Sequence, residues 1–250
     1  MRKKRVVNLD VSTGPYESFI NRIAELASMR VPSYVCVANV HMVVEAHNDG
    51  EFAAIVNGAD LVTPDGMPLA KSMRLLHGIA QERVAGMDLV PDLIADAERL
   101  GLSIFLYGST DGVLDAVVRR IALEHPRLRL AGTYSPPFRP LTPSEAVAES
   151  ARINASGANI VLVALGCPKQ ERWMAANRGR INAVMVGIGG ALPVYAGLQR
   201  RAPLIMQRLS LEWLYRLCQE PRRLFRRYLV TNTTFLLLLA VNYVRSKRQF

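Results

Sequence analysis

The chain has 250 residues, of which 50% are hydrophobic and 21% are charged, and its formal net charge is +10. This composition excludes a disordered chain, and the length is enough to bury a large core. The three cysteines form no Cys-x-x-Cys pair, so we expect reduced thiols in a cytoplasmic protein rather than a disulfide framework. The basic N-terminus is followed by no apolar stretch of the length that a signal peptide needs, and none is expected.

Short apolar runs bounded by glycine or proline alternate with amphipathic stretches along the chain. The runs predict six strands, at 34–38, 59–63, 103–107, 128–131, 159–164 and 183–186. The stretches predict helices at 42–56, 88–100, 111–124, 144–155 and 168–177. This alternation predicts an α/β class, with a Rossmann-like, mostly parallel sheet, helices on both faces, and ligands at the carboxyl ends of the strands.

The net charge is concentrated in the last fifth of the chain. From Arg200 to Phe250 there are ten arginines and one lysine against two glutamates, whereas the first 199 residues are nearly neutral. The apolar run 235–241 lies between basic clusters and is well short of the roughly 20 residues that span a bilayer. We therefore predict a catalytic body over 1–203 and a helical appendage over 204–250 that lies on an anionic membrane surface.

Glycine-rich loops follow three of the later predicted strands. Glycine before a helix lets backbone N–H groups approach an anion, and the helix dipole favours negative charge there. Several such loops predict a phosphorylated ligand, although glycine also ends strands for purely structural reasons. The candidate binding residues in these loops are Gly108, Gly166, Lys169, Gln170, Gly187 and Gly190.

Asp65 is the candidate for a reactive group. It lies at a predicted strand end between Pro64 and Gly66, where a carboxylate can face a cleft and accept a proton as a general base. The alternative is a simple turn, since Pro-Asp-Gly is a favoured turn sequence. Asn39 follows the first predicted strand, where it either orients a sugar hydroxyl or caps the next helix.

Several common cofactor sites are disfavoured by the residue pattern. In the run from Gly187 to Gly190, Leu192 stands where a dinucleotide fingerprint needs its third glycine, and the chain has no Walker A motif. The histidines share no spacing typical of a metal site, and no Asp-x-Asp is present. We therefore expect neither an organic cofactor nor a metal.

An ordered series of segments carries a resemblance to a known family. From about residue 35 to 227 the chain resembles the WecG/TagA/CpsF glycosyltransferases in Asn39 and in 59–66, 82–86, 164–171, 187–190, 196–197, 201–203 and 211–222. The resemblance implies a metal-independent, inverting enzyme that transfers a sugar from a UDP-sugar to a polyprenyl-diphosphate-linked acceptor. Such enzymes act at the cytoplasmic membrane face, in the synthesis of teichoic acid linkage units, enterobacterial common antigen or exopolysaccharide.

The resemblance also implies roles for individual residues. Asp65 matches the family's proposed base, and Asn39 and Arg83 are grouped with it in the catalytic set, Arg83 as a substrate-positioning residue. Three arginines match those of the family's C-terminal appendage, which is thought to close over the active site, and guanidinium groups suit a diphosphate well. They are Arg216, Arg223 and Arg226. Gln170 is assigned to substrate positioning.

Two departures from the family pattern leave the donor sugar open. Val37 stands where relatives often have Thr, and Pro193 stands where many have Asp. N-acetylmannosamine, its uronate, glucose and other hexoses are all compatible. A non-catalytic scaffold subunit and an NAD-dependent nucleotide-sugar enzyme are the alternatives, and self-association into a homo-oligomer is open. Nucleic acid is not expected as a partner, because few aromatic residues interleave with the basic tail.

Overall fold

The computed structural model describes residues 1–209 and 211–247. The strands in these residues are β1 Lys3–Val6, β2 Leu9–Ser12, β3 Ser33–Ala38, β4 Leu61–Pro64, β5 Ser103–Gly108, β6 Arg129–Tyr134, β7 Ile160–Ala164 and β8 Val184–Gly187. The helices before the C-terminal segment are α1 Tyr16–Ser28, α2 Val40–Asn48, α3 Gly50–Asn57, α4 Met67–His77, α5 Gly86–Leu100, α6 Asp111–Glu124, α7 Pro143–Ala155, α8 Lys169–Asn177 and α9 Ala191–Tyr195. Three further helices follow, α10 Leu204–Arg208, α11 Glu212–Gln219 and α12 Pro221–Lys247.

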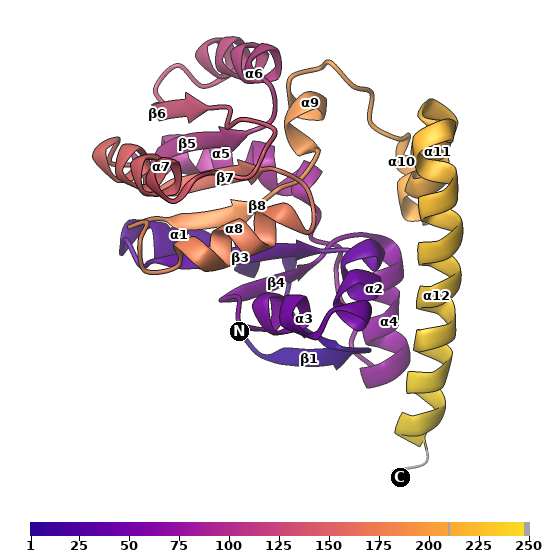
Figure 1. The fold of residues 1–250 in the computed structure, drawn as a ribbon. Helices are drawn as coiled ribbons and strands as arrows, with labels where there is room; N and C mark the ends of the chain where they lie inside the picture. The colour runs from indigo at the N-terminus through magenta and orange to yellow at the C-terminus, as the bar shows by residue number, and fades with distance from the viewer. Residues whose placement is uncertain (210, 248–250) are drawn as a thin grey trace. The chain divides into compact units, whose positions relative to one another are not determined.

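Six of the strands form one parallel sheet in the order β4-β3-β8-β7-β5-β6 (Figure 1). Every residue of β3 and β5 is buried, which is why these strands read as continuous apolar runs in the sequence. Helices surround the sheet, and the C-terminal segment is helical. The predicted α/β architecture with a helical C-terminal segment is therefore confirmed.

The contacts within the chain divide it into two compact units. The first unit consists of residues 1–16, 37–85 and 200–250, and the second consists of 17–36 and 86–199. The C-terminal helices thus belong to the same unit as the ends of β3 and β4. The glycine-rich loops after β5, β7 and β8 belong to the second unit.

One predicted helix is wrong in its extent. The sequence pattern predicts a single helix over 42–56, but the chain forms α2 and α3 with a break at Asp49. The Asp49 carboxylate accepts a hydrogen bond from the Phe52 N–H at 3.0 Å and so caps the start of α3. The Asp49 N–H donates to the Glu45 carbonyl at 3.0 Å and so ends α2. A capping aspartate ends one helix and starts the next without interrupting the apolar periodicity.

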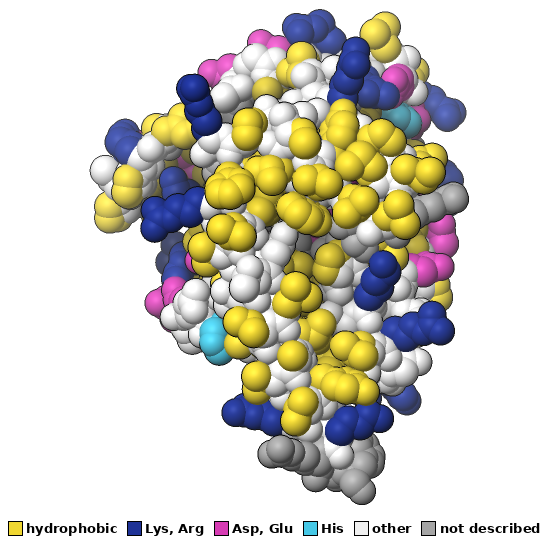
Figure 2. Space-filling view, turned by 90° about the vertical axis from the view of Figure 1, so that its right-hand side faces the viewer, with side chains coloured by type: hydrophobic (Ala, Val, Ile, Leu, Met, Phe, Trp, Pro, Cys, Tyr) yellow, Lys and Arg dark blue, Asp and Glu magenta, His cyan; other side chains and the backbone are white. Residues whose placement is uncertain are grey.

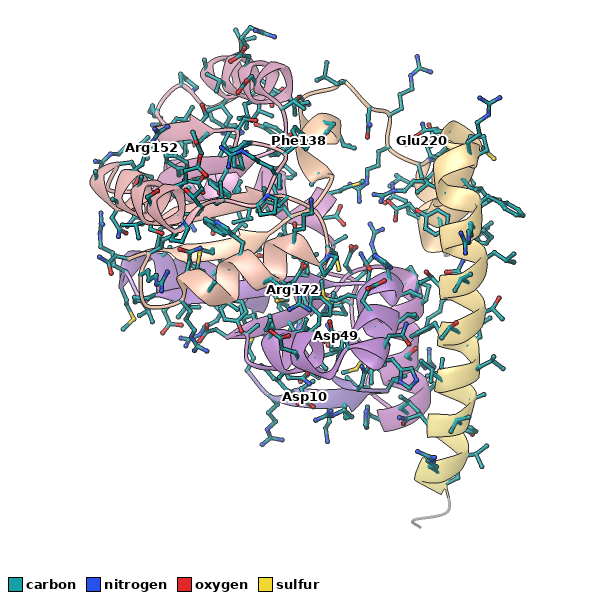
Figure 3. All side chains as sticks on the ribbon, in the orientation of Figure 1. Asp10, Asp49, Phe138, Arg152, Arg172 and Glu220 are labelled. Atoms are coloured by element: carbon teal, nitrogen blue, oxygen red, sulfur yellow. The ribbon has the colours of Figure 1, made fainter. Side chains whose placement is uncertain are left out.

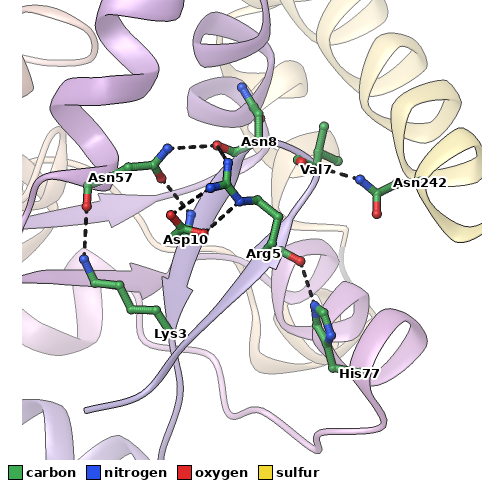
Figure 4. Close-up of polar contacts among 8 residues, drawn as sticks. All are labelled: Lys3, Arg5, Val7, Asn8, Asp10, Asn57, His77 and Asn242. Carbon is green, nitrogen blue, oxygen red and sulfur yellow. Dashed lines mark hydrogen bonds and ion pairs between the residues drawn. The ribbon is translucent and has the colours of Figure 1, made fainter. Parts of the chain in front are cut away.

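The N-terminal hairpin β1–β2 was not predicted, because its sequence is mostly polar. Side chains of the first unit hold it in place (Figure 4). Asn57 accepts a hydrogen bond from the Asp10 N–H at 2.7 Å and donates one to the Asn8 carbonyl at 3.0 Å. Near the far end of α12, Asn242 donates to the Val7 carbonyl at 3.4 Å. The first and last segments of the chain therefore meet in this unit.

Helix α12 packs on α2 and α4 with one of its faces. Leu224, Thr231 and Phe235 are buried, and their spacing of seven and four residues places them on one side of the helix. The start of α12 also contacts α11, where the rings of Trp213 and Tyr228 meet edge to face at 6.1 Å. The C-terminal segment therefore packs against the other segments of the first unit.

Helix α12 is longer than its short apolar run 235–241 suggests. Its stretch Leu224–Arg245 has 22 residues and is long and apolar enough, by length and composition only, to cross a membrane. The apolar run 235–241 is short because the polar residues 231–234 precede it, but α12 continues through these polar residues. Leu224 and Phe235 within this stretch are buried, so one side of the helix packs against its own unit.

Candidate functional site

Asp65 and Asn39 lie together at the carboxyl ends of two adjacent strands. The Asp65 N–H donates a hydrogen bond to the Ala38 carbonyl at 2.7 Å, so the residue that follows β4 meets the last residue of β3. Asn39 caps α2 by accepting from the Met42 N–H at 3.2 Å. Its side chain also forms a hydrogen bond with the Asp65 carboxylate. Asn39 therefore acts as a helix cap and as a neighbour of the candidate base at the same time.

The surroundings of Asp65 raise the pKa of its carboxyl group. The pKa is raised from 3.8 to about 6, and burial is the largest cause. Among the charged neighbours, Arg216 lowers this pKa most strongly, Glu212 raises it and Arg83 lowers it. The carboxyl group is thus ionised at neutral pH yet close to its titration point, which is where a general base works best.

Arg83 is held by the C-terminal segment. Its Nη1 lies 2.8 Å from Glu212 Oε2, and its Nη2 donates to Gln207 Oε1 at 2.9 Å. Gln207 is itself buried and donates to the Ala202 carbonyl at 2.7 Å. The side chain of Arg83 is only 13% exposed. Arg83 therefore contributes its charge near Asp65 and also ties the C-terminal segment to the rest of its unit.

The three arginines predicted from the C-terminal segment have different positions. Arg216 lies on α11, and its charge acts on the Asp65 carboxylate more strongly than that of any other cation. Arg226 is exposed on α12. The side chain of Arg223 lies outside the described residues. Of the two whose side chains are described, Arg216 is the one whose charge acts on the candidate base.

Two of the predicted glycines in the second unit have a packing role. Gly108 has a φ of +100°, and a Cβ atom there would lie 2.7 Å from the backbone carbonyl of Ala164 on the neighbouring strand. A Cβ at Gly187 would lie 2.8 Å from the Met174 side chain and 3.1 Å from that of Gln170. Gly166 and Gly190, by contrast, face open space. The latter two are the positions where a ligand could approach the backbone closely.

Gln170 is buried at the start of α8, where it organises the neighbouring loop. Its Oε1 accepts a hydrogen bond from the Gly189 N–H at 3.1 Å, and its Nε2 donates to Glu171 Oε1 at 2.7 Å. Glu171 is fully buried, which raises its pKa. Lys169 is exposed at the same helix end. Gln170 is thus placed to shape the loop after β8, and Lys169 is the polar side chain here that solvent reaches.

Within residues 1–209 and 211–247, no group of three or more His, Cys, Asp or Glu side chains could hold a metal ion. At the candidate site, Asp65 is a group that can accept a proton, and the guanidinium groups of Arg83 and Arg216 supply positive charge that could bind an anion.

Comparison with known proteins shows the family to which the chain belongs. The family model described as "Glycosyl transferase WecG/TagA/CpsF family" matches residues 4–249. The chain belongs to this family. Two curated relatives are each named "N-acetylglucosaminyldiphosphoundecaprenol N-acetyl-beta-D-mannosaminyltransferase". The relative from Bacillus subtilis (strain 168) is 29% identical over 225 residues, and that from Bacillus spizizenii (strain ATCC 23059 / NRRL B-14472 / W23) is 31% identical over 225 residues. Each alignment covers 89% of this chain and 86% of the relative.

The protein is therefore a glycosyltransferase, and its family membership agrees with the resemblance seen in the sequence. Sequence reasoning missed two side chains at the candidate site of this glycosyltransferase: Glu212, whose charge acts on Asp65, and Gln207, which accepts a hydrogen bond from Arg83. A signal for Glu212 was present, since it is one of only two acidic residues in the basic segment from Arg200 onward. No comparable signal marks Gln207.

Proposed function

We propose that this glycosyltransferase transfers a sugar from a UDP-sugar to a polyprenyl-diphosphate-linked saccharide in the synthesis of a bacterial cell-surface polymer. The observation that carries the proposal is the setting of Asp65, a half-buried carboxylate with a pKa of about 6 that has Arg216 and Arg83 as charged neighbours. The names of the two Bacillus relatives support an acceptor in which a sugar is linked through a diphosphate to a polyprenol.

In the proposed reaction, ionised Asp65 takes the proton of an acceptor hydroxyl. The acceptor oxygen attacks the anomeric carbon of the donor sugar as the bond to the UDP oxygen breaks, and that electron pair leaves with the diphosphate. A single displacement of this kind inverts the anomeric centre and needs one base and no covalent nucleophile. Asn39, through its hydrogen bond, holds the Asp65 carboxylate in place.

The developing negative charge of the leaving diphosphate needs donors in place before the reaction. We assign Arg216 to this task in the first unit, because a guanidinium group can form two parallel hydrogen bonds to a phosphate. Taken by itself, the second unit has open backbone positions at Gly166 and Gly190 and an exposed Lys169, which are groups that an anion could approach.

The donor sugar is expected to be a UDP-hexose whose identity depends on positions that depart from the family pattern. Val37 is buried on β3 and has no hydroxyl, whereas the family resemblance leads us to expect Thr there. Pro193 lies within α9, where many relatives have Asp. The N-acetylmannosaminyl group in the names of the Bacillus relatives is therefore not assigned to this chain.

The test is release of UDP by the full-length protein in detergent without divalent metal. The donors are UDP-N-acetylmannosamine, its uronate, UDP-glucose and other UDP-hexoses, and the acceptor is a polyprenyl-diphosphate-linked N-acetylglucosamine. We expect release that depends on the acceptor with one of these donors. A folded, vesicle-bound protein that releases no UDP with any of them would favour a non-catalytic scaffold subunit instead.

We further propose that the enzyme works at the cytoplasmic face of the cell membrane, held there by the outer face of α12. Exposed apolar side chains recur there at a helical spacing, and exposed basic side chains flank them (Figure 2). The apolar residues are Phe225, Leu229, Leu236, Leu237, Val241 and Val244. The basic residues are Arg222, Arg226, Arg245 and Lys247. An apolar strip with cations at both ends suits an anionic lipid surface.

Replacing Leu236→Ser and Leu237→Ser together is expected to weaken vesicle binding by about tenfold or more. Both side chains are 64% exposed, and burying each in lipid is worth roughly 1 to 2 kcal/mol. Co-sedimentation with vesicles containing anionic lipid measures the effect, and higher salt should weaken the binding of the parent protein. Leu123→Ser, at an 83% exposed position on α6, is the control. Equal binding by the double variant and the control would rule out this face of α12 as the membrane contact.

A further inference from the structure

Two side chains of α11 carry charges that act on the candidate base. Glu212 and Arg216 are four residues apart on this helix, so they lie on one face of it, a turn apart. Glu212 Oε2 is 2.8 Å from Arg83 Nη1, and Arg216 is the cation that acts most strongly on Asp65. A contact that fixes Glu212 therefore also decides which face of α11 is turned toward Asp65.

The partner of Glu212 is itself held at the end of β4. Next to Arg83, the Val84 N–H donates to the Pro64 carbonyl at 2.9 Å, and the Val84 carbonyl accepts from the Thr63 hydroxyl at 3.0 Å. Pro64 is the residue directly before Asp65. The Arg83–Glu212 ion pair thus connects α11 to the strand end that carries the candidate base.

This ion pair is more sheltered from solvent than a surface contact. The side chains of Arg83 and Glu212 are 13% and 22% exposed, and the second guanidinium nitrogen of Arg83 is engaged by the buried Gln207. Surface ion pairs contribute little because water screens them and their side chains must be ordered, whereas a sheltered, hydrogen-bonded pair is screened less. The pair is therefore suited to hold a helix in one orientation.

We propose that Glu212 is a positioning residue of the transfer site: its ion pair with Arg83 anchors α11 so that Arg216, one helical turn further on, is held over Asp65. The inference rests on the proposed function, since the task it gives to Arg216 is to bind the leaving diphosphate. Glu212 itself is not proposed to contact the donor or the acceptor. It acts through Arg216.

The test compares Glu212→Ala, Glu212→Gln and a matched control, Glu220→Gln, in the full-length protein. Glu220, labelled in Figure 3, is the other acidic residue of the C-terminal segment and lies between α11 and α12. Glutamine keeps an oxygen that can accept a hydrogen bond from Arg83, whereas alanine keeps none. We expect Glu212→Ala to speed hydrogen exchange of the α11 amides by about tenfold or more, with Glu212→Gln and Glu220→Gln close to the parent protein.

The kinetic test asks whether Glu212 acts through Arg216. We expect Glu212→Ala to lower acceptor-dependent transfer by about tenfold or more in the parent protein, but by less than about twofold when Arg216 is already alanine. Glu212→Gln should retain most of the activity. Losses that simply multiply in the double variant would overturn the proposal.

The pH profile adds a readout that a purely structural glutamate would not change. The charged groups that act on Asp65 are Arg216, Glu212 and Arg83, and Asn39 donates a hydrogen bond to it. Because the Glu212 charge raises the pKa of Asp65, Glu212→Gln should move the acid limb of kcat/KM to lower pH by a few tenths of a unit or more, while Glu220→Gln leaves it in place. An unchanged acid limb in Glu212→Gln counts against the inferred placement.

The two proposals fail in different ways. If the parent protein transfers no sugar from any donor, the proposed function fails, and hydrogen exchange of α11 still decides whether Glu212 anchors the helix. If transfer is found but Glu212→Ala leaves both hydrogen exchange and transfer unchanged, the proposed function stands and the role of Glu212 is overturned.

Discussion

Asp65→Ala is expected to lower acceptor-dependent sugar transfer by a factor of about 10² to 10⁴, which is the typical contribution of a positioned general base. The loss should appear in kcat, because a base acts on the proton that moves in the transition state, and binding of the UDP-sugar should change little. UDP release with a saturating donor, and donor affinity measured separately, provide the two readouts. The carboxylate control is Asp115→Asn, an exposed position on α6 that should leave transfer unchanged.

The pH dependence of the parent enzyme follows from the same carboxylate. With its pKa raised to about 6, Asp65 is an ionised base above that pH and a protonated acid below it. We therefore expect kcat/KM to reach a plateau above about pH 7 and to fall about tenfold per pH unit below about pH 6. A profile that stays flat down to pH 5 would assign the proton transfer to another group.

The raised pKa of Asp65 also predicts that its ionised form lowers the stability of the folded protein. Between about pH 4 and 6 the folded protein holds a proton at Asp65 that the unfolded chain has lost, so stability falls as pH rises through this window. Asp65→Asn should therefore raise the free energy of unfolding at pH 7.5 by roughly 1 to 3 kcal/mol while abolishing transfer. Urea unfolding measures this change. An inactive variant with lower stability than the parent would mean that the loss of activity arose from damage to the fold.

Arg216→Ala is expected to lower kcat by a factor of about 10² to 10³, the typical loss when one preorganised donor to a developing negative charge is removed. Arg216→Lys should recover only part of the activity, because an ammonium group restores the charge but not the two parallel hydrogen bonds of a guanidinium group. Single-turnover transfer with saturating donor separates this effect from weaker binding.

The control for Arg216 is Arg245→Ala, which removes the same charge from the far end of α12. It should weaken vesicle binding slightly and leave transfer from a detergent-soluble acceptor unchanged. If both arginine variants lose activity equally, the effect belongs to the overall charge of the C-terminal segment and Arg216 has no particular role. Because Arg216 lowers the pKa of Asp65, its removal should also move the acid limb of the pH profile upward.

Much of the fold could be predicted from local patterns of apolar and polar residues. Fully buried parallel strands such as β5 and β7 are continuous apolar runs, and α6 was located to the residue because its amphipathic period starts and ends sharply. The break between α2 and α3 could not be read in this way, because the capping Asp49 does not disturb the apolar period. The N-terminal hairpin was missed because its stability comes from contacts with side chains such as Asn57 and Asn242, which are distant in sequence.

For the candidate site, the sequence by itself determined the chemistry that is available: a carboxylate at a strand end, glycine-rich loops, and a basic C-terminal segment with a short apolar run. Residue type and position relative to a strand end are local properties, and they single out Asp65 and Asn39 as candidates. Only the tertiary structure decided that Glu212 pairs with Arg83 and that Arg216 is the cation acting most strongly on Asp65. The physical reason is that ion pairing and burial depend on which surfaces meet after folding. More than a hundred residues separate Arg83 from Glu212, and no local pattern records that contact.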